Sequence, residues 1–264
     1  MFSTEKRCRY AQPQLAEVIC QLRFPEILTI QANVPAEFQD AIRDQFPIYL
    51  RRQELPGNGQ LVKKEPVINH QFATADGTWR VNLTSKFISL TCSKYICWED
   101  FAAHLDKPLA AFIQIYKPAP FERIGLRYLN FISRYQLGLE GIPFSQLIQP
   151  CYLGPLAEED VPEQGVSRNT IDCEMAIRGG CRVKIHAGPG KVKRGTREDP
   201  EIKFIFDQDL FMSGNIPVNY SAGALQTLHD QAYPIFRGAI TDCLHKAMNP
   251  EMIYNETKAA IKTL

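Results

Sequence analysis

Residues 221–248 read SAGALQTLHDQAYPIFRGAITDCLHKAM, and this stretch decides the fold that we predict. Its apolar residues recur at the three-and-four spacing of one buried helix face: Leu225, Leu228, Ala232, Phe236, Ala239, Ile240, Cys243 and Ala247. The pattern predicts one helix, on the order of 40 Å long, that lies across a sheet built from the preceding strands.

The same stretch indicates where this helix starts, bends and ends. Ser221 is a residue type that caps helix starts, and Pro234 predicts a kink. Asn249-Pro250 ends the run, because proline disfavours helix in the residue before it. We expect the following polar side chains to lie on or beside the wetter face of the helix: His229, Asp230, Arg237, Asp242 and Lys246.

Period-two alternation predicts most of the strands. They are expected at residues 15–24, 79–84, 87–92, 121–132, 169–177, 182–187 and 202–206, with a ragged strand at 61–72. Ala75-Asp76-Gly77 is a hairpin turn signal, and residues 79–84 and 87–92 should pair as antiparallel neighbours. A short helix should begin at Pro35 and end at Phe46-Pro47, followed by a loop at 55–59. A second long helix is expected at 98–116.

The order strand, helix, several strands, helix occurs twice. Residues 1–117 form the first predicted half and residues 118–264 the second. We therefore predict a pseudo-duplicated α+β fold in which two long helices grip one large curved antiparallel sheet. Two versions stay open: a nearly closed, barrel-like helix-grip sheet, and an open saddle like that of the TATA-binding family.

Length, composition and charge exclude several classes of protein. The chain has 264 residues, 45% hydrophobic and 22% charged, as is ordinary for a globular protein. Its net charge of +1 argues against a surface that is basic all over, as in proteins covered by nucleic acid or anionic membrane, and leaves room for a local patch.

The cysteines and the termini predict a cytoplasmic location. None of the eight cysteines forms a CxxC pair or has histidines at zinc-ligand spacing, so we expect reduced thiols and no metal site. The N-terminus has no apolar signal core, and no run is long enough to span a bilayer. Contact with a membrane or vesicle surface would be peripheral.

Four segments resemble one known family. They are PQLAEVICQLRF at 13–24, the strand pair and YICWEDF at 79–101, RIGLRYLNFI at 123–132, and LHDQAYPIFRGAITDCLHKAM at 228–248. Together they are similar to a patchily distributed, largely uncharacterised prokaryotic family. Gln14 and Phe131 depart from its pattern. The resemblance implies an accessory role of the kind found in antiphage-defence neighbourhoods, with a protein partner encoded nearby, and it implies no reaction.

The RIGLRYLNFI segment supplies the first candidate site. Alternation places Arg127 on the face opposite Tyr128 and Asn130. A buried guanidinium needs an anionic partner, and we name Glu17. We predict a ligand-binding set of Arg123, Arg127, Tyr128, Asn130 and Glu17. A structural ion pair or a solvated arginine is the alternative.

The second candidate is RVKIHAGPGKVKRGTR at 182–197. Its six basic residues are Arg182, Lys184, Lys191, Lys193, Arg194 and Arg197, and the segment contains no acid. Gly188-Pro189-Gly190 should form a turn that presents the later cations at a hairpin tip. The segment would hold nucleic acid, phospholipid or an acidic partner electrostatically. A solvated hairpin is the alternative.

The sequence carries no catalytic or cofactor motif that we recognise, so we predict a non-enzymatic binding or sensor protein without cofactor. Asp207 and Asp209 are expected as solvated carboxylates at a strand end, and His104 and His229 as helix-surface histidines. Several aromatic residues suit a pocket for a lipid or other apolar ligand: Trp79, Phe87, Phe204, Phe206 and Phe236. Nucleic-acid binding is the alternative, and exposed arginine or lysine on a sheet face would favour it. Homo-oligomerisation stays open.

Overall fold

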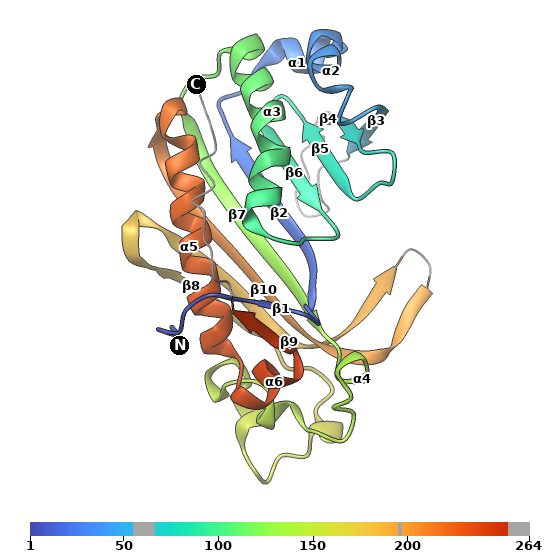
Figure 1. Cartoon of the computed structure of the whole chain (residues 1–264), viewed down its shortest axis with the longest axis vertical. Coiled ribbons are helices and arrows are strands. Elements are labelled where there is room, and N and C mark those ends of the chain that lie inside the picture. The colour runs from blue at the N-terminus through green and yellow to red at the C-terminus, as the bar shows by residue number, and fades with distance from the viewer. Residues whose placement is uncertain (55–66, 195–196, 253–264) are drawn as a thin grey trace, which may run out of the picture. The chain divides into compact units, whose positions relative to one another are not determined.

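The computed structural model describes residues 1–54, 67–194 and 197–252 (Figure 1). The fold is α+β, as predicted, with one large antiparallel sheet of nine strands in the order β3-β4-β5-β6-β2-β7-β10-β9-β8. In the described residues β3 and β8 each have one strand neighbour, so the sheet is open and the barrel-like version of the prediction is wrong. A separate pair joins β1 and β11.

The strands and helices are bounded as follows. The strands are β1 (Cys8–Tyr10), β2 (Leu15–Arg23), β3 (Ile48–Glu54), β4 (Val67–Ala73), β5 (Trp79–Leu83), β6 (Phe87–Cys92), β7 (Phe121–Ile132), β8 (Ile171–Ala176), β9 (Arg182–Arg194), β10 (Arg197–Ile216) and β11 (Pro250–Met252). The helices are α1 (Leu28–Ala32), α2 (Ala36–Ile42), α3 (Trp98–Tyr116), α4 (Arg134–Leu137), α5 (Ser221–Ala239) and α6 (Asp242–Ala247). Short 3-10 turns occupy much of residues 144–165.

The chain forms two compact units. Unit 1 comprises Met1–Glu17, Arg127–Leu210 and Thr227–Thr257, and unit 2 comprises Val18–Leu126, Phe211–Gln226 and Lys258–Leu264. From the central pair β2-β7 outward, the strands follow in reverse sequence order: β6, β5, β4 and β3 next to β2, and β10, β9 and β8 next to β7. A repeat of residues 1–117 in 118–264 stays a prediction.

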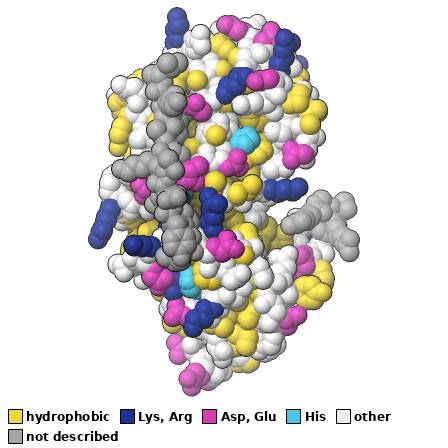
Figure 2. Space-filling model, in the orientation of Figure 1, with side chains coloured by type: hydrophobic (Ala, Val, Ile, Leu, Met, Phe, Trp, Pro, Cys, Tyr) yellow, Lys and Arg dark blue, Asp and Glu magenta, His cyan; other side chains and the backbone are white. Residues whose placement is uncertain are grey.

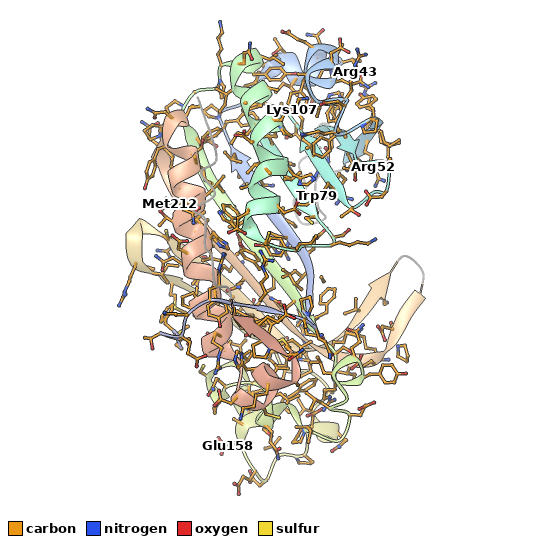
Figure 3. The ribbon with its side chains drawn as sticks, in the orientation of Figure 1. Arg43, Arg52, Trp79, Lys107, Glu158 and Met212 are labelled. Atoms are coloured by element: carbon orange, nitrogen blue, oxygen red, sulfur yellow. The ribbon has the colours of Figure 1, made fainter. Side chains whose placement is uncertain are left out.

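In unit 2, α3 lies on one face of the sheet formed by β2 and β6 to β3 (Figure 1). The face is built by alternate apolar residues, because every second side chain of a strand points to the same side. Trp79 of β5 packs against Phe101 of α3 at a ring-centroid distance of 5.6 Å, and Phe24 packs against Phe112 at 4.7 Å. Figure 3 labels Trp79 beside α3.

In unit 1, the second part of α5 covers β7 and β10. Phe236 of α5 contacts Phe206 of β10 at a ring-centroid distance of 6.1 Å. The N-terminal segment also binds this helix: the amide of Ser3 donates to the carbonyl of Pro234 at 2.9 Å, and Glu5 accepts from Arg237 at 2.8 Å. Among the described residues, no helix is long and apolar enough to cross a membrane.

The single long helix predicted for residues 221–248 is wrong, because the structure has two. Ile240 bridges to Ile148, and Thr241 donates its amide to the carbonyl of Leu147 at 2.9 Å, so the backbone leaves the helix there. Thr241 then caps α6 by accepting from the amide of Leu244 at 3.4 Å. The break shifts the buried face, and Leu244 is buried while Cys243 is exposed.

Three further details of this stretch differ from the prediction. Ser221 has helical φ and ψ angles of −56° and −42° and is the first residue of α5, so it does not cap it. His229 and Arg237 are buried instead of lying on the wetter face. Outside this stretch, β3 was not predicted at all, and the expected loop at 55–59 lies outside the described residues.

Candidate functional site

The predicted ligand-binding residues lie on two opposite faces of β7 and do not form one cluster. Tyr128 and Asn130 are buried on the face toward α5 in unit 1. The amide of Asn130 donates to the carbonyl of Phe206 at 3.1 Å, and the hydroxyl of Tyr128 bonds Nδ1 of His229 at 2.8 Å. Both side chains therefore hold β7 to its neighbours.

The bonds of His229 fix which ring nitrogen carries the proton. Arg7 contacts Nε2 of His229, and a guanidinium can only donate, so Nε2 accepts. In the neutral ring the proton is then on Nδ1 and is donated to Tyr128. Burial, reinforced by the positive charge of Arg7, lowers the pKa of His229 from 6.5 to about 3. The predicted surface histidine is thus a neutral, buried link between three chain segments.

Arg127 lies on the other face of β7 and has a carboxylate partner within the protein. Its Nε and Nη2 donate to Asp207 at 2.7 and 2.5 Å, and this hydrogen bond raises the pKa of the guanidinium. Glu17, the predicted partner, and Asp209 add weaker attraction. Asp207 lies inside β10, so the expected strand-end carboxylate is wrong. The side of Arg127 that would grip a ligand is occupied by Asp207.

Arg123 belongs to unit 2, whereas the other four residues of the predicted set belong to unit 1. Its guanidinium carbon lies 4.5 Å from the ring centroid of Phe211, a cation–π contact. A Cβ atom on Gly125 would come within 2.3 Å of Arg123 Nη1, so the space that glycine leaves is filled by this arginine. Arg123 packs against the sheet surface.

The basic segment 182–197 has no turn at Gly188-Pro189-Gly190, which corrects the prediction. Those residues lie within β9, which runs to Arg194 before β10 begins at Arg197. A Cβ on Gly188 would come within 2.3 Å of the carbonyl oxygen of Asn169, and one on Gly190 within 2.8 Å of Ile205 Cδ1. The glycines serve close packing of neighbouring chain segments.

Acidic side chains from adjacent strands pair with the described cations of this segment. Glu174 bonds Arg182 at 3.0 Å and lies opposite Lys184 in the β8-β9 register. Glu198 lies 3.0 Å from Lys191 and 3.4 Å from Lys193. The side chains of Arg194 and Arg197 are outside the described part. The predicted anion patch is thus interleaved with carboxylates that the linear segment does not contain.

Most of the aromatic residues proposed for an apolar pocket are core residues. Trp79, Phe204, Phe206 and Phe236 are buried and pack against helix or sheet neighbours, while Phe87 is half-buried. In the described chain no group of three or more His, Cys, Asp or Glu side chains could hold a metal ion.

A different surface, which the sequence did not reveal, lies on unit 2. We call it the far face: the side chains of β2, β6, β5, β4 and β3 that alternate with those directed at α3. One cross-strand row of the far face runs Gln21, Ser89, Asn82, Gln71 and Leu50. Gln71 donates to Asn82 at 2.9 Å, and Asn82 donates to Ser89 at 3.2 Å. These three buried side chains form a hydrogen-bonded amide ladder.

Exposed arginines surround this ladder. Arg23 on β2, Arg80 on β5 and Arg52 on β3 are exposed, and alternation along β7 adds Arg123. Among the far-face side chains of unit 2 that the structure describes there is no carboxylate. By alternation Glu17 lies on this face at the other end of β2 from Arg23, and it belongs to unit 1. Glu54 shares the face by register, and its side chain is outside the described part. On the side of α3, by contrast, acidic and basic side chains are interspersed (Figure 2).

The far face could be read from sequence only in part. Arg23 and Arg80 alternate with buried apolar residues in strands that were predicted. Their neighbours depend on the register of five strands, one of which was not predicted.

No family model matches the chain, and no curated protein matches it. The similarity of residues 123–132 and 228–248 to a prokaryotic family therefore stays a prediction from sequence.

Proposed function

We propose that this is a non-enzymatic binding protein whose far face on unit 2 takes nucleic acid. One observation carries the proposal: exposed Arg23, Arg52 and Arg80 share the far face, on which Glu17, at the far end of β2 from Arg23, is the one carboxylate among the described side chains. Guanidinium groups bind phosphate in a bidentate way and stay charged at any physiological pH. A face with this composition attracts a polyanion.

The spacing of the arginines fits an extended ligand. Arg52 and Arg23 are at the two ends of one cross-strand row, four strand spacings or about 19 Å apart. Arg80 lies on the middle strand, about 13 Å further along the strand direction. At about 3.4 Å per phosphate along one strand of a duplex, 19 Å covers roughly five or six phosphates. Half-buried Phe87, opposite Arg23, offers a ring on which a base can stack.

The amide ladder predicts how selective this binding is. Asn and Gln side chains can read base edges, but Gln71 and Asn82 are buried and donate to each other and to Ser89. The ladder therefore fixes the surface that carries the arginines. We expect binding that tolerates many sequences and depends strongly on salt.

The other predicted ligands have weaker support. The aromatic residues assigned to an apolar pocket are mostly core, and the cations of segment 182–197 are paired with acids. An accessory role in a prokaryotic defence-type system rests on the sequence resemblance and belongs to this proposal as its biological setting.

Fluorescence anisotropy with a labelled single-stranded 20-mer of DNA or RNA, and with a DNA duplex, tests the proposal. Three phosphate contacts to a single strand predict a log–log salt slope of about −2, or roughly a twentyfold loss of affinity between 50 and 200 mM salt. The double variant Arg23→Glu/Arg80→Glu should weaken binding at least tenfold.

The matched control is Arg43→Glu/Arg182→Glu, which changes the net charge equally at two exposed sites outside the far face. It should leave the affinity within about twofold. The proposal fails if none of the three nucleic acids binds at 50 mM salt, or if the control weakens binding and the far-face variant does not. Binding of anionic lipid vesicles in place of nucleic acid would also contradict it.

A further inference from the structure

The strand β3 is an edge of the sheet with an unbroken register. Its seven residues pair with β4 from Ile48 opposite Ala73 to Glu54 opposite Val67, with no bulge. No other described strand neighbours it. In such a strand, alternate residues direct their amide and carbonyl groups away from the sheet, where another strand can bond to them.

The side chains of β3 protect this edge only in part. Proteins usually block an edge strand with charged side chains, above all lysine, or with proline, a bulge or a very short length. On β3, Ile48 and Leu50 are 45% and 49% exposed, and Arg51 and Arg52 are exposed beside them. Apolar residues beside arginine are typical of protein interfaces.

The opposite edge, β8, differs in both respects. Its exposed positions alternate with half-buried ones, and two of them carry acids that are already bound, Glu174 to Arg182 and Asp172 to His186. Of the two edge strands of the described sheet, only β3 carries both exposed apolar side chains and exposed arginines.

A hydrogen-bond chain holds β3 in place. The hydroxyl of Tyr49 bonds Nδ1 of His70 at 2.9 Å, and Nε2 of His70 lies 3.2 Å from the carbonyl oxygen of Ile30. The carbonyl can only accept, so Nε2 carries the proton and Nδ1 accepts from the tyrosine hydroxyl. These bonds tie β3 through β4 to α1, so the edge is ordered before any partner binds, which lowers the entropy cost of binding.

We propose that β3 accepts an extended segment of a protein partner as a tenth strand of the sheet. Main-chain hydrogen bonds would give affinity, and alternate side chains would give specificity. Opposite Ile48 and Leu50 the segment should carry apolar residues, and opposite Arg51 it should carry Asp or Glu. The partner chemistry is therefore an extended peptide in which apolar and acidic residues alternate. This proposal uses the main-chain groups of β3, which the nucleic-acid proposal does not use. Because Leu50 and Arg52 also lie on the far face, the variants that test it leave Arg23, Arg52 and Arg80 in place.

The test selects 12-residue peptides from a random displayed library on the full-length protein and measures the winners by calorimetry. Alternating apolar and acidic residues are expected among them. Leu50→Lys should weaken binding at least tenfold, and Met175→Lys on β8 is the matched control that should not. N-methylation of a single peptide amide should abolish binding when that amide faces β3 and should be tolerated at the residues in between. The reason is that only alternate amides of a strand bond to its neighbour.

Four results would overturn the proposal. They are no enriched peptide, binding that Leu50→Lys leaves unchanged, no period of two in the N-methyl scan, and a dimer of the protein in sedimentation that Leu50→Lys dissociates. The last would make a second copy of the chain the occupant. Leu50→Lys adds a cation to the far face, so it should not weaken nucleic-acid binding in the anisotropy titration. Arg23→Glu/Arg80→Glu should leave peptide affinity unchanged, so the two proposals fail separately.

Discussion

The buried His229 makes a measurable prediction about stability and pH. Its pKa is lowered from 6.5 in the unfolded chain to about 3 in the fold, first by burial and then by Arg7. Below pH 6.5 the unfolded chain therefore binds a proton that the folded chain refuses. Well above pH 6.5 the histidine therefore adds almost no pH dependence to the free energy of unfolding. As the pH falls from 6.5 toward 3, the free energy of unfolding decreases.

The magnitude follows from the two pKa values. At pH 5 the unfolded histidine is almost fully protonated and the folded one almost fully neutral. Integration from pH 7.5 to pH 5 gives a loss of about 2 kcal/mol from this residue alone. Carboxylates with lowered pKa, such as Asp242, lose their contribution mainly at lower pH.

Urea unfolding followed by circular dichroism at both pH values measures the effect. His229→Gln keeps an acceptor for Arg7 and removes the titrating ring, so the variant should lose about 2 kcal/mol less than the wild type between pH 7.5 and pH 5. His186→Gln on β9, an exposed site, is the control and should follow the wild type. Parallel pH profiles for wild type and His229→Gln would refute a neutral, buried His229.

Three further substitutions test the packing. Gly188→Ala should destabilise the protein by roughly 1–3 kcal/mol in urea unfolding, because its Cβ would meet the backbone oxygen of Asn169, while Gly141→Ala, which meets nothing within 4 Å, should be nearly neutral. Thr241→Ala removes the cap of α6 and should cost about 1 kcal/mol, and an unchanged midpoint would contradict that cap. Leu244→Ala should lower the unfolding free energy by about 2–5 kcal/mol and Cys243→Ala by much less. If Cys243→Ala cost more than Leu244→Ala, the result would support the single unbroken helix predicted from sequence.

Elements with a one-sided local pattern were predictable from sequence. β2 and β7 alternate buried and less buried residues over most of their length. β5 and β6 are largely buried on both faces but alternate apolar and polar residue types, and α3 has a regular apolar stripe. β3 was missed because its apolar residues Ile48 and Leu50 are exposed and its inward positions include Arg51, so no alternation marks a buried face. An edge strand gains its place from pairing with β4, which is a non-local interaction.

The errors in the candidate site have the same physical origin. The partner of Arg127 is Asp207, 80 residues away, and the contact that buries His229 comes from Arg7, 222 residues away. A helical periodicity gives the direction of a side chain and not what covers it. The break after Ala239 likewise depends on backbone bonds to Leu147 and Ile148, which a pattern within residues 221–248 cannot contain.

The net charge of +1 is compatible with a face that binds a polyanion, because the acids of unit 2 are concentrated elsewhere. Glu37 and Asp40 lie on α2, and Glu99, Asp100 and Asp106 lie on α3. These helices lie on the side of the sheet opposite the far face, so the sheet itself separates their acids from a ligand there, and physiological salt screens exposed charges over about 8 Å. A phosphate on the far face therefore interacts mainly with Arg23, Arg52 and Arg80. The distribution of charge between the two faces decides the interaction, and the sum over the chain does not.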